Sequence, residues 1–277
     1  MKDRLRRYIE GRLSLGEPEI IFSHLSRSEA LARVRGCGAG REDAPNRAPT
    51  PRPAPPRPGD REIESLAANG RAEQLRQLPD LPTLGEVAAL CTRCGLHGSR
   101  QHVVFGEGDP HARIVCVGEA PGVVEDDTGR PFVGRAGQLL DRLLLSVGLR
   151  RGEVYICNVL KCRPPGNRDP RPEEVEACSP FLLRQLELID PEVIVAFGAF
   201  AARTLLGTRE SLGRLRGRTH LYEGYPVVVT YHPAALLRNP WWTRPTWEDL
   251  QRVREVAARG REREVARSGP AQGGLFG

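Results

Sequence analysis

The stretch Ile114–Gly122, which reads IVCVGEAPG, determines how the rest of the chain can be interpreted. Its first four residues are apolar, and a glycine, a carboxylate and a Pro-Gly turn follow at once. A short apolar run rich in β-branched residues and bounded by turn residues is typical of a strand buried on both faces. Such strands belong to parallel sheets, in which ligands bind beyond the carboxyl ends of the strands.

Three further runs have the same character, and helical patterns separate them. The predicted strands are Ile114–Val117, Val154–Val159, Val193–Phe197 and Val227–Thr230. The predicted helices cover residues 140–147, ended by Gly148, and residues 175–189, 199–206 and 246–258. Strands that alternate with helices predict an α/β fold in which helices cover both faces of a parallel sheet.

Composition divides the chain into three parts. Residues 36–60 are rich in Pro, Ala, Arg and Gly, and such a stretch cannot bury enough apolar surface to fold. With the weakly helical residues before it, we expect residues 1–60 to form an extension and a linker. A helix over residues 61–78 should open an ordered domain that spans residues 61–262. Residues 263–277 read as a disordered tail.

The charge balance and the cysteine count restrict the class of protein. The 277 residues carry a formal net charge of +6, which suits a phosphate-backbone partner but is weak evidence by itself. We find no signal peptide and no run long enough to span a membrane, so we expect a cytoplasmic protein. In that compartment seven cysteines indicate metal binding, catalysis or simple burial rather than disulfides.

Four cysteines form a candidate metal site. Cys91 and Cys94 make a C-x-x-C pair, whose geometry lets two thiolates hold one metal. Cys162 follows the second predicted strand, and Cys178 lies on the helix after it. The spacing leaves zinc, a 4Fe–4S cluster, and buried thiols at the last two positions all open. The remaining cysteines are assigned to apolar strands or to the linker: Cys116, Cys157 and Cys37.

Polar and aromatic residues gather where the predicted strands end. Glu119, Asn158 and His232 each follow a strand, and we expect them at one edge of the sheet. Asn158 and His232 also have purely structural interpretations, as a loop-bracing amide and a hydrogen-bonded core histidine, and the acidic run of residues 125–127 can be a solvated loop. The turn after the first strand lacks the residues of a phosphate-binding loop and the glycine spacing of a dinucleotide site, which excludes nucleotide cofactors.

Taken together, four segments closely resemble the family 4 uracil-DNA glycosylases, which carry iron and sulfur. They are GEAPG at 118–122 with the segment GRPFVGRAGQLL at 129–140, NVLKCRPP at 158–165 and HPAALLR at 232–238. The resemblance covers the chain from about Cys91 to about Arg254. It implies a three-layer α/β/α fold around a central four-stranded parallel sheet. It also implies a 4Fe–4S cluster held by Cys91, Cys94, Cys162 and Cys178.

The resemblance also implies roles for residues at the strand ends. Phe132 is expected to stack on a flipped-out uracil and Asn158 to read its edge, with Gly118 and Ala120 beside them. His232 is expected to donate a hydrogen bond to uracil O2, where negative charge develops.

DNA binding and water activation complete the expected site. Leu236 or Leu237 would fill the gap left by the flipped base, and Arg238 would hold a phosphate. For the attacking water, Glu119 is the first candidate and Glu125 the second. A better-known uracil glycosylase family has an aspartate where this chain has Ala120.

The expected partner is uracil-containing DNA, single- or double-stranded, bound by a monomer without any membrane. Because neither Lys2 nor Lys161 is placed to cut the strand, the product should be an abasic site in an intact strand. The alternative is a metal-bearing nucleic-acid-binding module without catalysis. A related branch that forms a covalent DNA adduct is disfavoured, because its glutamine-bearing turn and basic loop are missing. A zinc base deaminase is disfavoured, because its H-x-E signature is missing.

Overall fold

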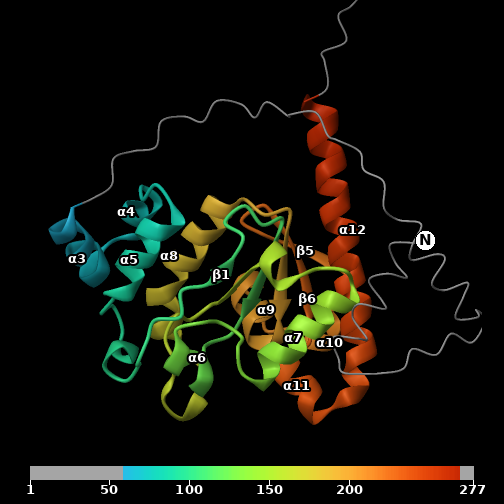
Figure 1. Cartoon of the computed structure of the whole chain (residues 1–277), viewed down its shortest axis with the longest axis horizontal. Helices are drawn as coiled ribbons and strands as arrows, with labels where there is room; N and C mark the ends of the chain where they lie inside the picture. The colour runs from blue at the N-terminus through green and yellow to red at the C-terminus, as the bar shows by residue number, and fades with distance from the viewer. Residues whose placement is uncertain (1–58, 269–277) are drawn as a thin grey trace, which may run out of the picture.

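The computed structural model describes residues 59–268, and a single six-stranded sheet forms its centre (Figure 1). The strand order is β1-β3-β2-β4-β6-β5. The strands are β1 Glu107–Gly108, β2 Ile114–Gly118, β3 Tyr155–Asn158, β4 Val193–Phe197, β5 Thr219–Tyr222 and β6 Tyr225–Thr230. The four predicted strands are the four middle ones, and they pair in parallel.

The sheet nevertheless has two more strands than the expected four. Both additional strands lie at the edges and pair antiparallel, β1 with β3 and β5 with β6. β1 contains two residues, and β5 alternates exposed with half-buried side chains. Neither therefore shows the continuous apolar run that marks a strand buried on both faces.

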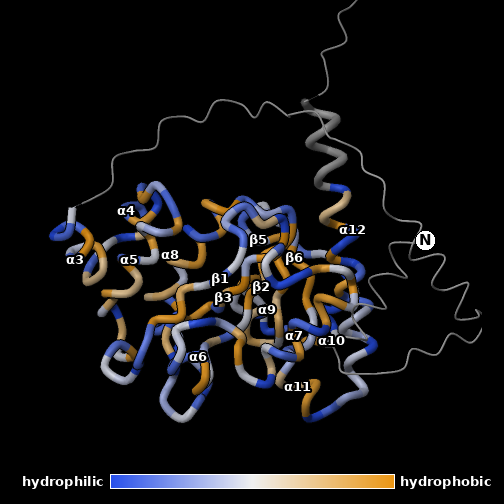
Figure 2. The backbone as a smooth tube through the Cα atoms, viewed as in Figure 1, coloured by the Kyte–Doolittle hydropathy of each residue, from blue (hydrophilic) through white to orange (hydrophobic). Residues whose placement is uncertain are grey.

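Helices cover both faces of the sheet, which confirms the three-layer α/β/α arrangement. The helices of one face are α7 Arg135–Ser146, α11 Pro233–Arg238 and α12 Thr243–Ser268. Those of the other face are α8 Pro172–Ile189, α9 Gly198–Leu206 and α10 Leu212–Leu215. The side chains of β2 alternate between the two cores: Ile114 and Cys116 face one, Val115 and Val117 the other. The four parallel strands form the apolar centre of the molecule (Figure 2).

A smaller helical layer packs on α8. It consists of α3 Asp60–Asn69, α4 Ala72–Arg76 and α5 Leu81–Ala89. The single helix expected over residues 61–78 is wrong, because the chain turns at Gly70. A Cβ atom there would stand 2.5 Å from the Leu66 carbonyl oxygen, so the turn requires glycine.

Some expectations fall wholly or partly outside the described residues. Of the expected extension, residues 1–60, only residues 59 and 60 are described. Of the expected tail, residues 263–277, those from 269 onward lie outside the described residues. α12 begins three residues earlier than the predicted helix and extends to Ser268, beyond its expected end at Ala258. Between residues 59 and 268, no helix combines the length and apolar character that crossing a membrane requires.

Candidate active site and cysteine pocket

A cleft of about 1240 Å³ opens at the carboxyl ends of the parallel strands. The register brings these ends together, since Gly118 pairs with Asn158 and Phe197 with Thr230. The cleft is large enough to admit a nucleoside. Seven of the predicted site residues line it: Glu119, Ala120, Glu125, Phe132, Asn158, His232 and Arg238.

Asn158, Gly118 and Phe132 form a tightly packed floor. A Cβ on Gly118 would stand 2.3 Å from the Asn158 side-chain oxygen Oδ1 and 2.5 Å from Phe132 Cζ. Glycine is therefore the residue that lets the amide and the ring approach the end of β2. The side chain of Asn158 is buried, and its Oδ1 has no hydrogen-bond partner in the structure. An unpaired buried acceptor is costly unless a ligand supplies a donor.

The position of Phe132 depends on a strained turn before α7. Phe132 has a φ of 50°, a left-handed conformation that is uncommon for aromatic residues. The Arg151 guanidinium holds the turn by donating to the carbonyl oxygens of Pro131 at 2.5 Å and Phe132 at 3.0 Å. Gly137 allows the close approach of α7, because a Cβ there would stand 1.8 Å from the Phe132 oxygen.

His232 faces the Phe132 ring and caps α11. The two rings are stacked, with centroids 5.4 Å apart and planes inclined by 29°. The Ala234 N–H donates to His232 Nδ1 at 3.2 Å, which leaves Nε2 to carry the proton of the neutral ring. Burial, with a smaller contribution from Arg238, lowers the pKa of His232 to about 4. The imidazole is therefore neutral at pH 7 and can donate one hydrogen bond through Nε2.

A polar network fixes the end of β6 directly before His232. The buried Asp249 carboxylate accepts a hydrogen bond from the Thr230 hydroxyl and forms an ion pair with Arg216, both at 2.7 Å. Arg216 also lies over the Tyr231 ring, 4.3 Å from its centroid. The Trp242 ring stacks on the Tyr231 ring, with ring centroids 4.5 Å apart and planes inclined by 3°. Helix α12 thus anchors the strand end that presents the histidine.

The two candidate acids have different surroundings. Glu125 accepts hydrogen bonds from the backbone N–H groups of Gly122, Val133 and Gly134, at 2.8–3.2 Å, and so braces the turn after β2 against the start of α7. Glu119 lines the cleft, and burial together with the neighbouring Asp169 carboxylate raises its pKa. Because three N–H groups already engage both oxygens of Glu125, the geometry favours Glu119 over Glu125 for water activation.

The three predicted DNA-contacting residues differ in how far they are exposed in the structure. All three lie in the short helix α11 Pro233–Arg238, and Leu236 is 2% exposed within the apolar core. Leu236 therefore cannot fill a gap in DNA, and that expectation is corrected. Leu237 is 43% exposed, and Arg238 lines the cleft. The next turn exposes Trp241, which is 88% exposed.

The comparisons with known proteins agree on one family. The model of the uracil DNA glycosylase superfamily matches residues 105–251. The type-4 uracil-DNA glycosylase of Thermotoga maritima is 56% identical over 151 residues, which cover 54% of this chain and 79% of the relative. The type-4 enzymes of Pyrobaculum aerophilum and Archaeoglobus fulgidus are 47% and 46% identical, covering 58% and 61% of this chain and 86% and 89% of their own lengths. The chain belongs to the type-4 uracil-DNA glycosylases.

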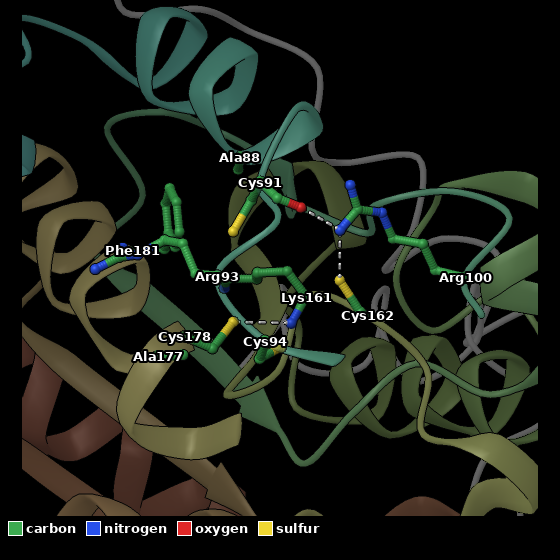
Figure 3. Close-up of a pocket in the computed structure, with 10 residues that line it drawn as sticks. All are labelled: Ala88, Cys91, Arg93, Cys94, Arg100, Lys161, Cys162, Ala177, Cys178 and Phe181. Carbon is green, nitrogen blue, oxygen red and sulfur yellow. Dashed lines mark hydrogen bonds between the residues drawn. The ribbon is translucent and has the colours of Figure 1, made fainter. Parts of the chain in front are cut away.

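In this type-4 glycosylase the four predicted cysteine ligands line one pocket (Figure 3). They come from the turn after α5, the segment after β3 and helix α8: Cys91, Cys94, Cys162 and Cys178. All four thiols are free. Burial raises the pKa of Cys162 to about 11 and that of Cys178 to about 12, so a bound metal would have to displace their protons.

Two nitrogen donors are already directed at these sulfurs. The Arg100 guanidinium donates to Cys162 Sγ at 3.4 Å and to the Cys91 carbonyl oxygen at 2.7 Å. The backbone N–H of Lys161 donates to Cys178 Sγ at 3.3 Å. Among the described side chains, those of residues 59–259, no three cysteine, histidine or acidic groups are placed so that they could hold a metal ion.

Sequence reasoning missed several residues of the glycosylase site. Arg151 and Asp249 act from distant elements and carry no local pattern. Asp169 had a detectable signal, because it belongs to the polar segment after the second predicted strand. Lys161 was considered only as an amine for strand cleavage, yet its side chain is buried beneath Asn158.

Proposed function

We propose that this chain hydrolyses the N-glycosidic bond of uracil flipped out of DNA and leaves an abasic site in an intact strand. The observation that carries the proposal is the unpaired, buried Asn158 Oδ1 in the floor of the cleft. Phe132 and His232 lie beside it, and the chain belongs to the type-4 family.

Uracil matches the groups that the floor presents. Its N3–H can donate to Asn158 Oδ1, and its O4 can accept from the Asn158 amide nitrogen. Cytosine presents an acceptor at N3 and a donor at N4, so it would leave buried polar groups unpaired. That kind of mismatch gives strong discrimination. The Phe132 ring can stack on either base.

Bond cleavage requires a place for the electron pair and a nucleophile. As the C–N bond breaks, its electron pair moves onto uracil, and the deoxyribose gains positive character. The neutral His232 can donate from Nε2 to uracil O2, where part of the negative charge resides. Glu119 can accept a proton from the water that adds to the sugar carbon, which completes the hydrolysis.

The mouth of the cleft can hold the DNA strand. Leu237 is the exposed apolar side chain that can fill the gap left by a flipped base. Arg238 lines the cleft together with Arg203 and Arg209, and these cations suit the sugar–phosphate backbone.

The cysteine pocket fits a 4Fe–4S cluster held by Cys91, Cys94, Cys162 and Cys178. Four free thiols surround one pocket, and two N–H donors are directed at its sulfurs. Four thiolates can also hold a single zinc, and the similarity to the type-4 enzymes favours the iron–sulfur cluster. The cluster would join the turn after α5 to the segment that follows Asn158.

The remaining features of the proposal concern the protein as a whole. Residues 61–262 would form the catalytic domain, preceded by an extension and followed by a tail. The enzyme would act as a monomer. A thiolate-held cluster is suited to a reducing compartment, in agreement with a cytoplasmic location.

The test is an assay on oligonucleotides that contain one uracil, single-stranded or paired with guanine or adenine. Free uracil should appear, and the strand should break only after alkali. Strand breakage without alkali would contradict the monofunctional reaction. DNA binding without release of uracil would support the alternative, a non-catalytic metal-bearing module.

A further inference from the structure

Lys161 places a buried ammonium directly behind the uracil-reading residue. It is 2% exposed, and Nζ donates to the Asn158 carbonyl oxygen at 2.7 Å and to Gln185 Oε1 at 2.5 Å. Both acceptors are neutral oxygens. Among the described residues no carboxylate pairs with this ammonium, and the nearest groups that could carry negative charge are the thiols of the cysteine pocket. A charge without an ion-pair partner is costly to bury, and this cost indicates a role beyond packing.

The surroundings of Lys161 are built to receive a cation. Gln185 is fully buried, and its amide nitrogen donates to the Phe105 carbonyl oxygen at 2.9 Å and to the Tyr155 hydroxyl at 3.1 Å. These two bonds orient the amide so that Oε1 is directed at Nζ. The Asn158 peptide carbonyl supplies the second acceptor from the end of β3.

The choice of lysine is itself informative. The chain has 41 basic residues, and only Lys2 and Lys161 are lysines. An ammonium is a compact point charge that two or three oxygens can satisfy, whereas a guanidinium has five donors in a rigid plane. A lysine ammonium therefore suits a site that presents two oxygens, those of the Asn158 carbonyl and of Gln185 Oε1.

The position of Lys161 between two sites completes the argument. Its side chain lines the cysteine pocket, and its own backbone N–H donates to Cys178 Sγ (Figure 3). Its ammonium is bonded to the peptide of Asn158, whose side chain lines the active-site cleft. The positive charge thus contacts the peptide of the residue whose side chain lines the cleft, in an interior where charges are poorly screened.

We propose that Lys161 is a positioning residue whose buried positive charge, held on the Asn158 carbonyl, favours departure of uracil as an anion. The inference rests on the proposed glycosylase function. Lys161 transfers no proton and forms no bond to DNA. It acts on the negative charge that uracil gains as the C–N bond breaks, and on the orientation of Asn158.

Two variants separate the charge from the hydrogen bond. Lys161→Met removes both, whereas Lys161→Gln keeps an N–H donor for the Asn158 carbonyl and removes only the charge. Each variant is compared with the wild-type holoprotein on oligonucleotides that contain uracil or 5-fluorouracil, which is the better leaving group. Single-turnover rates, DNA affinity, visible absorption and Tm are measured for all three proteins.

We expect both variants to excise uracil roughly 10- to 100-fold more slowly, the size of a lost charge-assisted interaction. DNA affinity should stay within a few-fold, and 5-fluorouracil should lose much less rate than uracil because its anion needs less support. The Gln variant keeps the inference testable even if the Met variant does not fold.

Equal rate losses for the two bases, or full activity of Lys161→Gln, would show that the ammonium only holds the backbone, and would overturn the inference. In either case the wild type would still excise uracil. A wild type that releases no uracil would instead refute the proposed function, and the inference with it.

Discussion

The side-chain oxygen of Asn158 lies 2.3 Å from the point where a Cβ on Gly118 would stand. The Asn158 amide and the end of β2 are therefore in direct contact, and a methyl group cannot be added between them. The same methyl would stand 2.5 Å from Phe132 Cζ, so it would displace both side chains that we propose to hold uracil.

Gly118→Ala should lower uracil excision by about 10- to 100-fold, because a small misplacement of binding groups is costly to catalysis. Single-turnover kinetics on a uracil oligonucleotide measure this effect. Gly213→Ala is the matched control, since a Cβ there meets nothing within 4 Å. Wild-type activity of Gly118→Ala would show that Asn158 and Phe132 are not held where the reaction needs them.

Asn158→Asp tests how the base is identified. The carboxylate removes the donor that faces O4, so uracil excision should fall by orders of magnitude, consistent with about 2–4 kcal/mol for an inverted buried hydrogen bond. Some excision of cytosine can appear, limited by its poorer leaving ability. Release of uracil and of cytosine is measured for each variant.

Phe132→Ala provides the comparison for Asn158→Asp, since stacking does not depend on the hydrogen-bonding edge of the base. In a protein that retains Asn158, this substitution should slow the excision of uracil without creating activity on cytosine. Near wild-type uracil excision by a folded Asn158→Asp protein would refute the role of Asn158 as the uracil sensor.

The pH dependence of the reaction should follow Glu119 rather than His232. Burial raises the pKa of Glu119, and the carboxylate must be ionised to accept a proton from water. kcat/KM should therefore fall as the pH drops through a pKa above 4.5. The pKa of His232 is lowered to about 4, so its neutral Nε2–H persists above that pH and adds no inflection near 6.5.

Glu119→Gln should lower the rate and remove the acidic limb of this profile. Glu125→Gln weakens the brace on the turn after β2, so it should reduce the rate while the acidic limb remains. The Glu125 variant thus controls for the loss of a nearby carboxylate. An acidic limb that persists in Glu119→Gln would move the assignment to another group.

The cluster is tested by colour and by metal content. Protein purified without oxygen should be brown, and Cys91→Ser or Cys162→Ser should lose iron and thermal stability. Cys116→Ala is the matched control, because that thiol is buried in the strand core and away from the cysteine pocket. Colourless wild-type protein with stoichiometric zinc would contradict the iron–sulfur assignment.

The adjacent leucines of α11 should respond in opposite ways. Leu236→Ala should lower the free energy of unfolding by about 2–5 kcal/mol, because it leaves a cavity in the core. Leu237→Ala should barely change stability, yet it should slow excision from double-stranded DNA more than from single-stranded DNA, where no gap has to be filled. Thermal unfolding and excision rates distinguish the two. Equal loss on both substrates would argue against a wedge.

The sequence alone was sufficient for the parallel centre of the sheet and for the residues at its carboxyl edge. Strands buried on both faces must be continuously apolar, so Val193–Phe197 and its partners were recognisable without a structure. Chain reversal through helices then places the strand ends together, which brought Glu119, Asn158 and His232 to one edge. The edge strands β1 and β5 were not predicted from the sequence, because a short or half-exposed strand has no distinctive pattern.

Only the tertiary structure showed how residues of the same type differ in burial and in hydrogen-bond partners. Leu236 and Leu237 are the same residue type in one short helix, and packing against the core makes one structural and the other exposed. Glu119 and Glu125 differ because folding brings three backbone N–H groups to Glu125. The ammonium of Lys161 reaches Asn158 and Gln185 through a buried network that joins β3 to α8. A local sequence pattern records side-chain types and spacing, whereas burial and partners depend on segments far apart in the chain.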